Sequence, residues 1–452
     1  MRMELPEHVR EIIRKLENQG FEAYAVGGCV RDTLLGRLPG DWDITTSAKP
    51  EQIKAIFHRT VDTGIKHGTV TVLMDHTGYE VTTYRIDGEY EDGRHPKEVQ
   101  FTSCLTEDLR RRDFTINAMA YNERDGRVDC FGGAEDLKRK VIRCVGSASE
   151  RFTEDALRIL RAVRFSAQLD FSIDEETREA IRRLSENLKK ISAERIQAEL
   201  VKLLLSDHPS RLRTAWELGI TGAVLPEFDR LMETPQNNPH HCRNVGEHTL
   251  RALECVRPDR YLRLAMLFHD FGKPDCRTTD EAGIDHFYGH PEKSRQLAQE
   301  ILRRLKFDND TIYYVTRLVY WHDMELGDSP RTVRRAVHRV GEDIYPLLFE
   351  VKQADMEAQS LYQREEKEAS LLKSRSLYDQ VKREGNCLSL KNLAITGKDL
   401  MQLGLLPGPQ IGEVLQKLLS EVLDEPDRNT EQYLRNRARE MISGSGGRTG
   451  NR

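Results

Sequence analysis

The sequence predicts an α+β protein with a mixed sheet and helices in an N-terminal head, followed by an elongated all-α body. Three observations predict this class. Short β-type runs bounded by glycine or polar turns occur before about residue 145. From residue 149 onward, apolar residues recur every three or four positions, as in Leu157, Leu160, Val163 and Ala167. The chain has 452 residues, enough for about three domains of ~150 residues each.

The expected elements follow one another along the chain. Strands are expected at 23–26, 70–74 and 79–83, because these runs are short, β-branched and bounded by turn residues. Residues 149–205 are expected to be helical, and Pro226, Pro235 and Pro239 indicate a linker. The remaining expectations are helices over 240–360, a polar, charged helix at 361–383, a last helical unit at 392–434 and a disordered Ser/Gly-rich end at 443–452.

These changes in composition and in apolar spacing divide the chain into five segments. They are a head at 1–148, a helical neck at 149–235, a histidine-rich domain at 236–360, a helical C-terminal body at 361–440 and a disordered tail at 441–452. The histidine-rich domain holds most of the 14 histidines.

Composition excludes several classes of protein. The net charge of -5, from 69 basic and 74 acidic side chains, excludes a wholly basic nucleic-acid coat but permits a local basic surface. Eight scattered cysteines without a Cys-x-x-Cys pair argue against a disulfide scaffold and a zinc knuckle. No run approaches the ~18 apolar residues of a membrane helix, and the N-terminus lacks a signal-peptide core. We therefore expect a cytoplasmic protein with no membrane partner.

A pair of glycines is the first candidate for phosphate binding. Gly27 and Gly28 separate an expected strand from a helix that begins near Val30. Glycines let the backbone approach a phosphate, and free amides at a helix start can hold it. Arg31 adds positive charge in the first turn. Taken alone, the pair is more often an ordinary strand-to-helix turn.

Two aspartates strengthen this candidate. Asp41 and Asp43 are two residues apart, so on a strand they project from the same face. Carboxylates side by side repel each other and favour a bound cation. Glu80, on a neighbouring expected strand, can add a third oxygen ligand. Such oxygen ligands suit Mg²⁺, and two ions can activate a hydroxyl and stabilise departing pyrophosphate. The alternative for an isolated Asp-x-Asp is a solvated turn.

Four motifs occur in sequence. GGCVRD at 27–32 is followed by Asp41-Trp42-Asp43, and RRDFTINA occupies 111–118. DLKRKVIRCVG then occupies 136–146, and RFTEDALRILRAVRF occupies 151–165. Over at least residues 21–230 the chain resembles the class II tRNA nucleotidyltransferases and bacterial poly(A) polymerases. The resemblance implies a head with a polymerase-β-like fold and a neck that selects the nucleotide and binds RNA.

The resemblance also implies which residues bind the nucleotide. They are Gly27, Gly28, Arg31, Arg111, Arg112, Asp113, Asn117, Glu154, Asp155, Arg158, Arg161 and Arg164. The arginine run that precedes Asp113 is expected to contact triphosphate or ribose; by itself it is more often a solvated charge patch. Arg161 and Arg164 are candidates for phosphate binding. The implied catalytic residues are Asp41, Asp43 and Glu80.

The Asp155–Arg158 pair is the candidate for base selection. On a helix these residues are neighbours at i, i+3, and Glu154 can orient Arg158 at i, i+4. A carboxylate accepts from an amino group, while a guanidinium donates to an acceptor beside it. Cytosine and adenine both present that pattern, whereas uracil and guanine place a carbonyl opposite the carboxylate. The alternative is a surface ion pair worth ~0.3–0.5 kcal/mol.

The histidine-rich domain carries a second candidate site. Its residues are His248, His269, Asp270, His290, His322 and Asp355. Their order resembles the HD phosphohydrolase domain, in which histidines and aspartates from several helices bind one or two divalent metals. Imidazole and carboxylate ligands suit Mn²⁺, Ni²⁺ or Fe²⁺, and also Mg²⁺. The alternative is that each histidine is an ordinary core or surface residue.

Two further segments bear on the subtype. The polar segment 84–101 resembles the flexible loop that helps CCA-adding members to change from C to A, with residues 89–95 the discriminating part. Residues 393–412 resemble the tail that packs against tRNA, and Ile411, Leu415, Leu418, Leu419 and Val422 form an expected packing stripe.

The leading hypothesis is a template-independent CCA tRNA nucleotidyltransferase. It would use ATP and CTP with Mg²⁺, bind the acceptor arm of tRNA and act as a monomer or homodimer. Narrower alternatives add only CC, only A or a poly(A) tail. An alternative of another class is an HD nucleotide phosphohydrolase with an RNA-binding head, and a third is a noncatalytic RNA-binding protein.

Overall fold

The computed structural model describes residues 3–87 and 99–445, which form two compact units. Unit 1 extends to Arg230 and includes Arg304–Phe307; unit 2 comprises Leu231–Arg303 and the chain from Asp308 onward. The expected segments 149–235 and 236–360 each contribute residues to both units, and the division into five segments stays a prediction. None of the described helices is long and apolar enough to cross a bilayer.

A seven-stranded mixed sheet forms the head in unit 1, in the order β3-β4-β5-β2-β1-β8-β9. Strand β2 pairs with β5 in parallel, and the other neighbouring pairs are antiparallel. The strands are β1 (Ala23–Val26), β2 (Ile44–Thr46), β3 (Thr60–Gly64), β4 (Thr69–Met74), β5 (Thr77–Thr83), β8 (Met119–Asn122) and β9 (Gly126–Asp129). All four residues of β1 are buried, because this strand lies in the middle of the sheet. The three strands expected from the sequence are confirmed.

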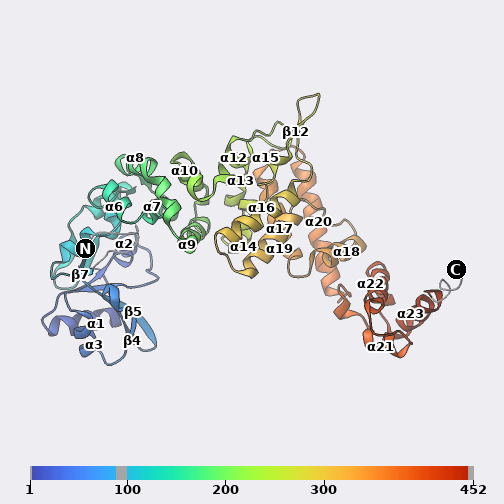
Figure 1. Cartoon of the computed structure of the whole chain (residues 1–452), viewed down its shortest axis with the longest axis horizontal. Coiled ribbons are helices and arrows are strands. Elements are labelled where there is room, and N and C mark those ends of the chain that lie inside the picture. Colours follow the sequence, from blue (N-terminus) through green and yellow to red (C-terminus); the bar gives the residue numbers. More distant parts are fainter. Residues whose placement is uncertain (1–2, 88–98, 446–452) are drawn as a thin grey trace. The chain divides into compact units, whose positions relative to one another are not determined.

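Helices accompany the sheet and continue after it (Figure 1). The head contains α1 (Glu7–Asn18), α2 (Gly28–Leu34), α3 (Pro50–Ile56), α4 (Leu105–Arg110) and α5 (Gly133–Arg139). The rest of unit 1 contains α6 (Ala148–Glu154), α7 (Leu157–Leu169), α8 (Glu175–Leu184), α9 (Ala193–Leu204), α10 (Leu212–Glu217) and α11 (Ile220–Val224). The expected stripe of Leu157, Leu160, Val163 and Ala167 is buried on α7, which packs against α9.

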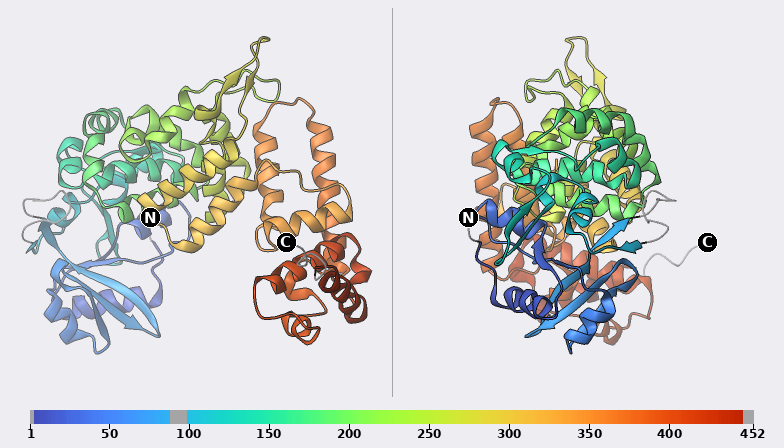
Figure 2. Two further views of the ribbon diagram at one scale, coloured as in Figure 1. Left: turned by 45° about the vertical axis from the view of Figure 1, so that its right-hand side comes forward. Right: turned by 90° about the vertical axis from the view of Figure 1, so that its left-hand side faces the viewer.

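Unit 2 is a bundle of helices (Figure 2). Its first part contains α13 (Val245–Cys255), α14 (Arg260–Phe268), α15 (Lys273–Cys276), α16 (His290–Arg304), α17 (Asn309–Trp321), α18 (Pro330–Val340) and α19 (Tyr345–Ala358). Helix α13 packs against α14 and α19, and α14 packs against α17. The polar helix expected at 361–383 is α20 (Arg364–Arg383), followed by α21 (Gly397–Gln402), α22 (Pro409–Asp424) and α23 (Glu431–Ser445).

Three expectations about the fold need correction. Residues 441–445, expected within a disordered tail, continue helix α23. The region after residue 150 is not wholly helical, because β11 (Ser172–Ile173) pairs with β10 (Val141–Ile142), and β12 (Thr278–Thr279) pairs with β13 (Asp285–His286). The turn at Gly283, with φ of 78°, closes the second pair. Pro226 does not mark a linker but begins α12 (Pro226–Glu233), since proline is accommodated in the first turn of a helix.

A buried ion pair joins α7 to α9. Arg164 donates from Nε to Glu199 and from Nη1 to Gln168 Oε1 at 2.6 Å, and both Arg164 and Glu199 are buried. The Arg164 guanidinium lies 3.7 Å from the centre of the Phe165 ring. Removing one partner of such a pair leaves an uncompensated buried charge.

We predict that Glu199→Ala destabilises the protein by about 3–5 kcal/mol, because Arg164 would remain buried without its carboxylate. Urea unfolding of the full chain measures the change. Glu194→Ala, an exposed residue in the first turn of α9, is the matched control and should cost less than about 1 kcal/mol. The double variant Arg164→Met with Glu199→Leu should recover most of the loss. Equal effects of the two single variants would contradict the prediction.

Candidate functional site

Three carboxylates gather where β2 begins beside β5, two interior strands of the head sheet. Asp41 and Asp43 precede β2 and are not within a strand, which corrects the sequence expectation; Val26 N nevertheless donates to Asp43 O at 3.0 Å. Ile44 is paired with Val81 across the parallel β2–β5 ladder, so the same register places Asp43 opposite Glu80. Burial raises the pKa of Glu80, and Asp43 and Asp41 raise it further. The three carboxylates therefore repel one another, as a cation site requires.

Arg112 opposes this negative charge. Burial raises the pKa of Asp43, Arg112 lowers it and Asp41 raises it. Gly27 has φ of 84°, a backbone conformation that favours glycine, and a Cβ there would lie 2.9 Å from Nη1 at the flexible end of Arg112. Arg31 donates to Asp32 Oδ1 at 2.8 Å and to Asn117 Oδ1 at 2.7 Å. The expected helix start is confirmed, because α2 begins at Gly28.

The RRDFTINA motif is fixed by ionic contacts. Arg111 donates from Nε to Asp108 Oδ1 at 2.9 Å. Asp113 accepts from Arg161 Nε at 2.8 Å and from Asn117 Nδ2 at 3.2 Å. Burial raises the pKa of Asp113, but the Arg161 guanidinium outweighs it and lowers the pKa to about 2. The motif thus places a permanently charged carboxylate next to an arginine of α7.

The candidate base-selecting residues lie where two helices meet, and not on one helix as expected. Asp155 terminates α6 with φ of -142°, and α7 begins at Leu157. Asp155 Oδ1 accepts from Leu157 N at 3.1 Å, a local bond that favours aspartate at helix ends. The expected Glu154–Arg158 contact is nevertheless present, with Nη1 donating to Oε2 at 2.6 Å. Arg158 Nη2 also donates to Arg111 O at 2.9 Å.

Arg195 is a site residue that the motifs did not indicate. From α9 it donates to both oxygens of Asp155, at 3.2 and 2.7 Å. This bidentate contact fixes the plane of the carboxylate. Arg195 lies 40 residues from Asp155 in the sequence, so local spacing could not have revealed the pair. Among the expected phosphate-binding residues, Arg164 is buried against Glu199 and is not presented to solvent.

The expected C-to-A loop is described only at its two ends. Strands β6 (Arg85–Asp87) and β7 (Val99–Phe101) pair in antiparallel fashion. Residues 89–95, on which the subtype prediction depends, lie outside the described residues.

The six candidate metal ligands of unit 2 converge on one point. They come from α13, from the segment that ends α14, from the start of α16, from the end of α17 and from α19. His248, His269 and Asp270 form one group whose ligand atoms all lie within 4.8 Å of one another; Asp270, His290 and His322 form a second. Asp355 Oδ1 lies 2.9 Å from His248 Nε2. Asp270 is therefore shared by two potential coordination groups.

The backbone orients three of these histidines. His269, His290 and His322 each place Nδ1 2.7 or 2.8 Å from the carbonyl oxygen three residues earlier. Donation from Nδ1 leaves the Nε2 lone pair directed at Asp270, the tautomer that metal ligation needs. Burial and the neighbouring His290 lower the pKa of His322 to about 3, so its imidazole is neutral. Among the described residues, neither Asp270 oxygen accepts a well-aligned hydrogen bond, although Lys273 Nζ lies 2.8 Å from Oδ2. This donor set fits divalent metal ions.

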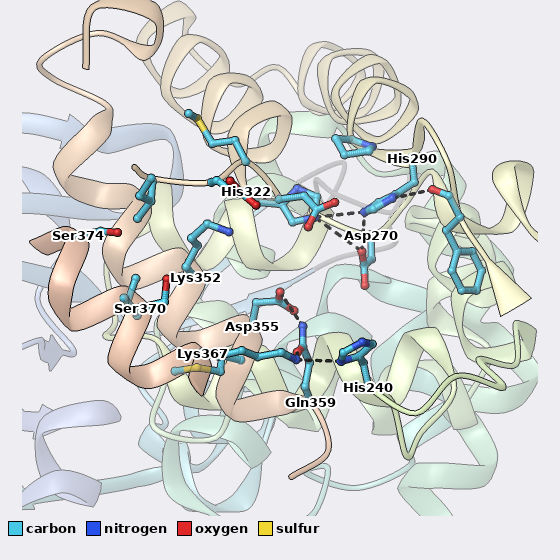
Figure 3. A pocket seen from close by; sticks show the side chains of 18 of the residues that line it. His240, Asp270, His290, His322, Lys352, Asp355, Gln359, Lys367, Ser370 and Ser374 are labelled. Carbon is cyan, nitrogen blue, oxygen red and sulfur yellow. Dashed lines mark hydrogen bonds and ion pairs between the residues drawn. The ribbon is translucent and has the colours of Figure 1, made fainter. Parts of the chain in front are cut away.

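A cavity of about 1050 Å³ opens onto these ligands. Figure 3 shows Asp270, His290, His322 and Asp355 facing its interior. Lys273, Lys352 and Lys367 also line it. The cavity therefore combines a cluster of metal-ligating groups with positively charged side chains.

Three family models match the chain. "Poly A polymerase head domain" matches residues 23–143, "Probable RNA and SrmB- binding site of polymerase A" matches residues 170–232, and "tRNA nucleotidyltransferase domain 2 putative" matches residues 279–438. The first match covers the head sheet and its carboxylates. Fold and matches together define a nucleotidyltransferase with a poly(A) polymerase-type head.

Curated relatives and a solved structure identify the family. A CCA-adding enzyme from Pediococcus pentosaceus is 36% identical over 431 residues, 95% of this chain and 96% of that protein. One from Leuconostoc mesenteroides is 56% identical over 200 residues, 44% of this chain and half of the relative's length. The structure of the Bacillus stearothermophilus CCA-adding enzyme in complex with CTP is 30% identical, with a TM-score of 0.72, and covers 98% of this chain and 99% of that one. The chain belongs to the family of the CCA-adding enzymes.

We predict that Mn²⁺ binds to unit 2 and that Asp270→Asn weakens this binding at least ~10–100-fold. Loss of an outer-shell partner already lowers metal affinity by that factor, and Asp270 belongs to both ligand groups, so its loss should lower the affinity more. Isothermal titration of the full chain measures the affinity. Asp280→Asn removes an exposed aspartate of the same unit that pairs with His286, and should leave Mn²⁺ affinity unchanged. Equal affinity of the wild type and the Asp270 variant would contradict the prediction.

Proposed function

We propose that this chain adds C, C and A to the 3′ end of tRNA, using CTP and ATP and releasing pyrophosphate. The 3′ oxygen of the tRNA bonds to the α-phosphorus while the bond to the pyrophosphate oxygen breaks. The observation that carries this proposal is the base-selecting pair: Asp155 and Arg158 are held at one junction by partners from three segments. Membership in the CCA-adding family over nearly the whole chain supports it.

Asp41, Asp43 and Glu80 are proposed to hold Mg²⁺. Burial and the neighbouring carboxylates raise the pKa values of Asp43 and Glu80, which supports this assignment because a bound cation relieves the repulsion. When bound, Mg²⁺ supplies activation of the attacking hydroxyl and charge neutralisation of the leaving pyrophosphate. Arg112, whose positive charge lowers the pKa of Asp43, is proposed to contact the triphosphate.

Base selection rests on the fixed orientation of two side chains. A carboxylate accepts about four hydrogen bonds, and the described contacts of Asp155 are those from Arg195 and Leu157 N. Asp155 can therefore still accept from the amino group of cytosine or adenine. Uracil and guanine would place a carbonyl there, and a mismatched buried polar pair costs ~1–3 kcal/mol.

The test uses purified protein, Mg²⁺ and a tRNA that lacks its last three nucleotides. CTP alone, ATP alone and both together are supplied, and the 3′ ends are sequenced. Addition of CC from CTP, followed by A when ATP is present, is the expected result. An end that stops at CC with both nucleotides, or extension only of a tRNA already ending in CC, would instead indicate a CC-adding or an A-adding enzyme. A long A tail would indicate a poly(A) polymerase.

We predict that Asp43→Asn lowers the rate of CCA addition by ~10²-fold or more. Loss of a metal ligand should lower the activity more than loss of an outer-shell partner, which costs ~10–100-fold. His269→Ala, a matched variant in unit 2, should leave CCA addition unchanged. The rates are measured in single-turnover incorporation of labelled CTP. Loss of addition in the His269 variant alone would contradict the assignment of catalysis to the head.

We predict that Arg195→Met raises misincorporation of UTP relative to CTP by ~5–100-fold. Asp155 would lose the bidentate contact that orients it, and the free-energy penalty of ~1–3 kcal/mol against a mismatched base would be lost as a result. The ratio of kcat/KM for the two nucleotides measures discrimination. Arg182→Met removes an exposed arginine of α8 that pairs with Glu175 and should preserve the ratio. An unchanged kcat/KM ratio in the Arg195 variant would contradict the proposal that Arg195 positions Asp155.

A second function is proposed for unit 2: an HD-type, metal-dependent phosphohydrolase. The shared Asp270 and the three histidines oriented by backbone carbonyls support it. Mn²⁺, Ni²⁺, Fe²⁺ and Mg²⁺ are the candidate ions, and when bound such an ion supplies an activated water for attack on a phosphate ester. Hydrolysis of p-nitrophenyl phosphate with each ion tests the proposal. His269→Ala should abolish the hydrolysis, and Asp43→Asn should leave it intact.

A further inference from the structure

Lys352 is a positively charged residue of the unit 2 cavity that metal binding by the neighbouring groups does not require. It lies on α19, three residues before Asp355, so both side chains are on one face of the helix. Both line the cavity. In Figure 3 the Lys352 ammonium is directed into the space near His322 and Asp355. Lys352 thus lines the same cavity as four of the candidate metal ligands.

The three lysines that line this cavity differ in their partners. Lys273 Nζ lies 2.8 Å from Asp270 Oδ2 and donates to Gln236 Oε1 at 2.8 Å. Lys367 donates to Gln359 Oε1 at 2.7 Å. Within residues 3–87 and 99–445, Lys352 Nζ has no hydrogen bond and no carboxylate within 4.0 Å, although Asp323, Asp355 and Glu325 contribute to its electrostatic surroundings. Lys352 alone among the three keeps its donors for another group.

A largely desolvated ammonium without a partner is costly. Burial lowers the pKa of Lys352, whereas the neighbouring carboxylates raise it. Retaining such a group in the wall of a cavity is favourable when a bound anion completes its hydrogen bonds. An ammonium offers three donors and suits the oxygens of a phosphoryl group as a point charge. Four of the candidate metal ligands line the same cavity.

We propose that Lys352 binds a non-bridging oxygen of the phosphoryl group of the substrate in the unit 2 cavity. This inference rests on the phosphohydrolase function proposed for unit 2. It assigns to α19 two tasks one helical turn apart: Asp355 belongs to the metal-ligating cluster, and Lys352 binds the anion. Lys273, already bonded to Asp270 and Gln236, is a positioning residue for the metal ligands.

The test is titration of inorganic phosphate into the full chain with Mn²⁺ present, by calorimetry. The phosphate-binding event that His269→Ala removes defines the unit 2 site, as distinct from phosphate binding in the head. Lys352→Met should weaken this event by about tenfold to a hundredfold, as expected for hydrogen bonds to charged groups. Lys352→Arg should restore part of it. Lys373→Met, an exposed lysine of α20, should leave it unchanged.

Two further measurements separate anion binding from a structural role. The affinity for Mn²⁺ and the melting temperature without phosphate should not fall in Lys352→Met, because the variant removes an unpartnered charge. The KM for p-nitrophenyl phosphate should rise about tenfold or more. Absence of any phosphate binding dependent on His269 would overturn both the phosphohydrolase function and this inference. Binding that depends on His269 but is unchanged in Lys352→Met would overturn this inference alone.

Discussion

Buried charge that must be neutralised is the constraint on which unit 1 depends. Asp113 is bonded to Arg161, and Glu199 is bonded to Arg164, so two carboxylates and two arginines tie the RRDFTINA segment to α7 and α9. Neither helix can shift without exposing an unpaired charge to an apolar surrounding. The junction that holds Asp155 and Arg158, the candidate base-selecting residues, involves these same helices. Its geometry therefore depends on an ionic network whose members need not touch the nucleotide.

The same constraint takes a different form in unit 2. Asp270 is fully buried, with Lys273 and His248 beside it and three further imidazoles directed at it. Carbonyl groups three residues upstream fix the tautomers of those imidazoles, which is how an outer shell prepares a metal site. A carboxylate in such surroundings is stabilised by cations. The two units thus use buried carboxylates for two purposes: structural cohesion in one and a candidate metal centre in the other.

Periodicity and motif order predicted much of this molecule. The strands at 23–26, 70–74 and 79–83, the buried stripe of α7 and the polar α20 all follow from local sequence, because apolar spacing reflects which face must be buried. The order of the motifs also predicted the six residues that come together in unit 2, and their role as metal ligands stays a prediction. Local spacing failed where a helix ended: Asp155 was expected within a helix, and its own side-chain bond to Leu157 N terminates the regular structure.

Sequence alone determined the family, the order of the motifs and which residue types could do chemistry, since these depend on identity and spacing along the chain. The tertiary structure decided which charges face one another. Arg195 contacts Asp155, 40 residues away in the sequence, and Arg164 pairs with Glu199. Among the residues that the structure describes, Lys352 has no hydrogen-bond or ion-pair partner. Such pairings depend on the packing of helices distant in sequence, and side-chain burial, not spacing, sets their strength.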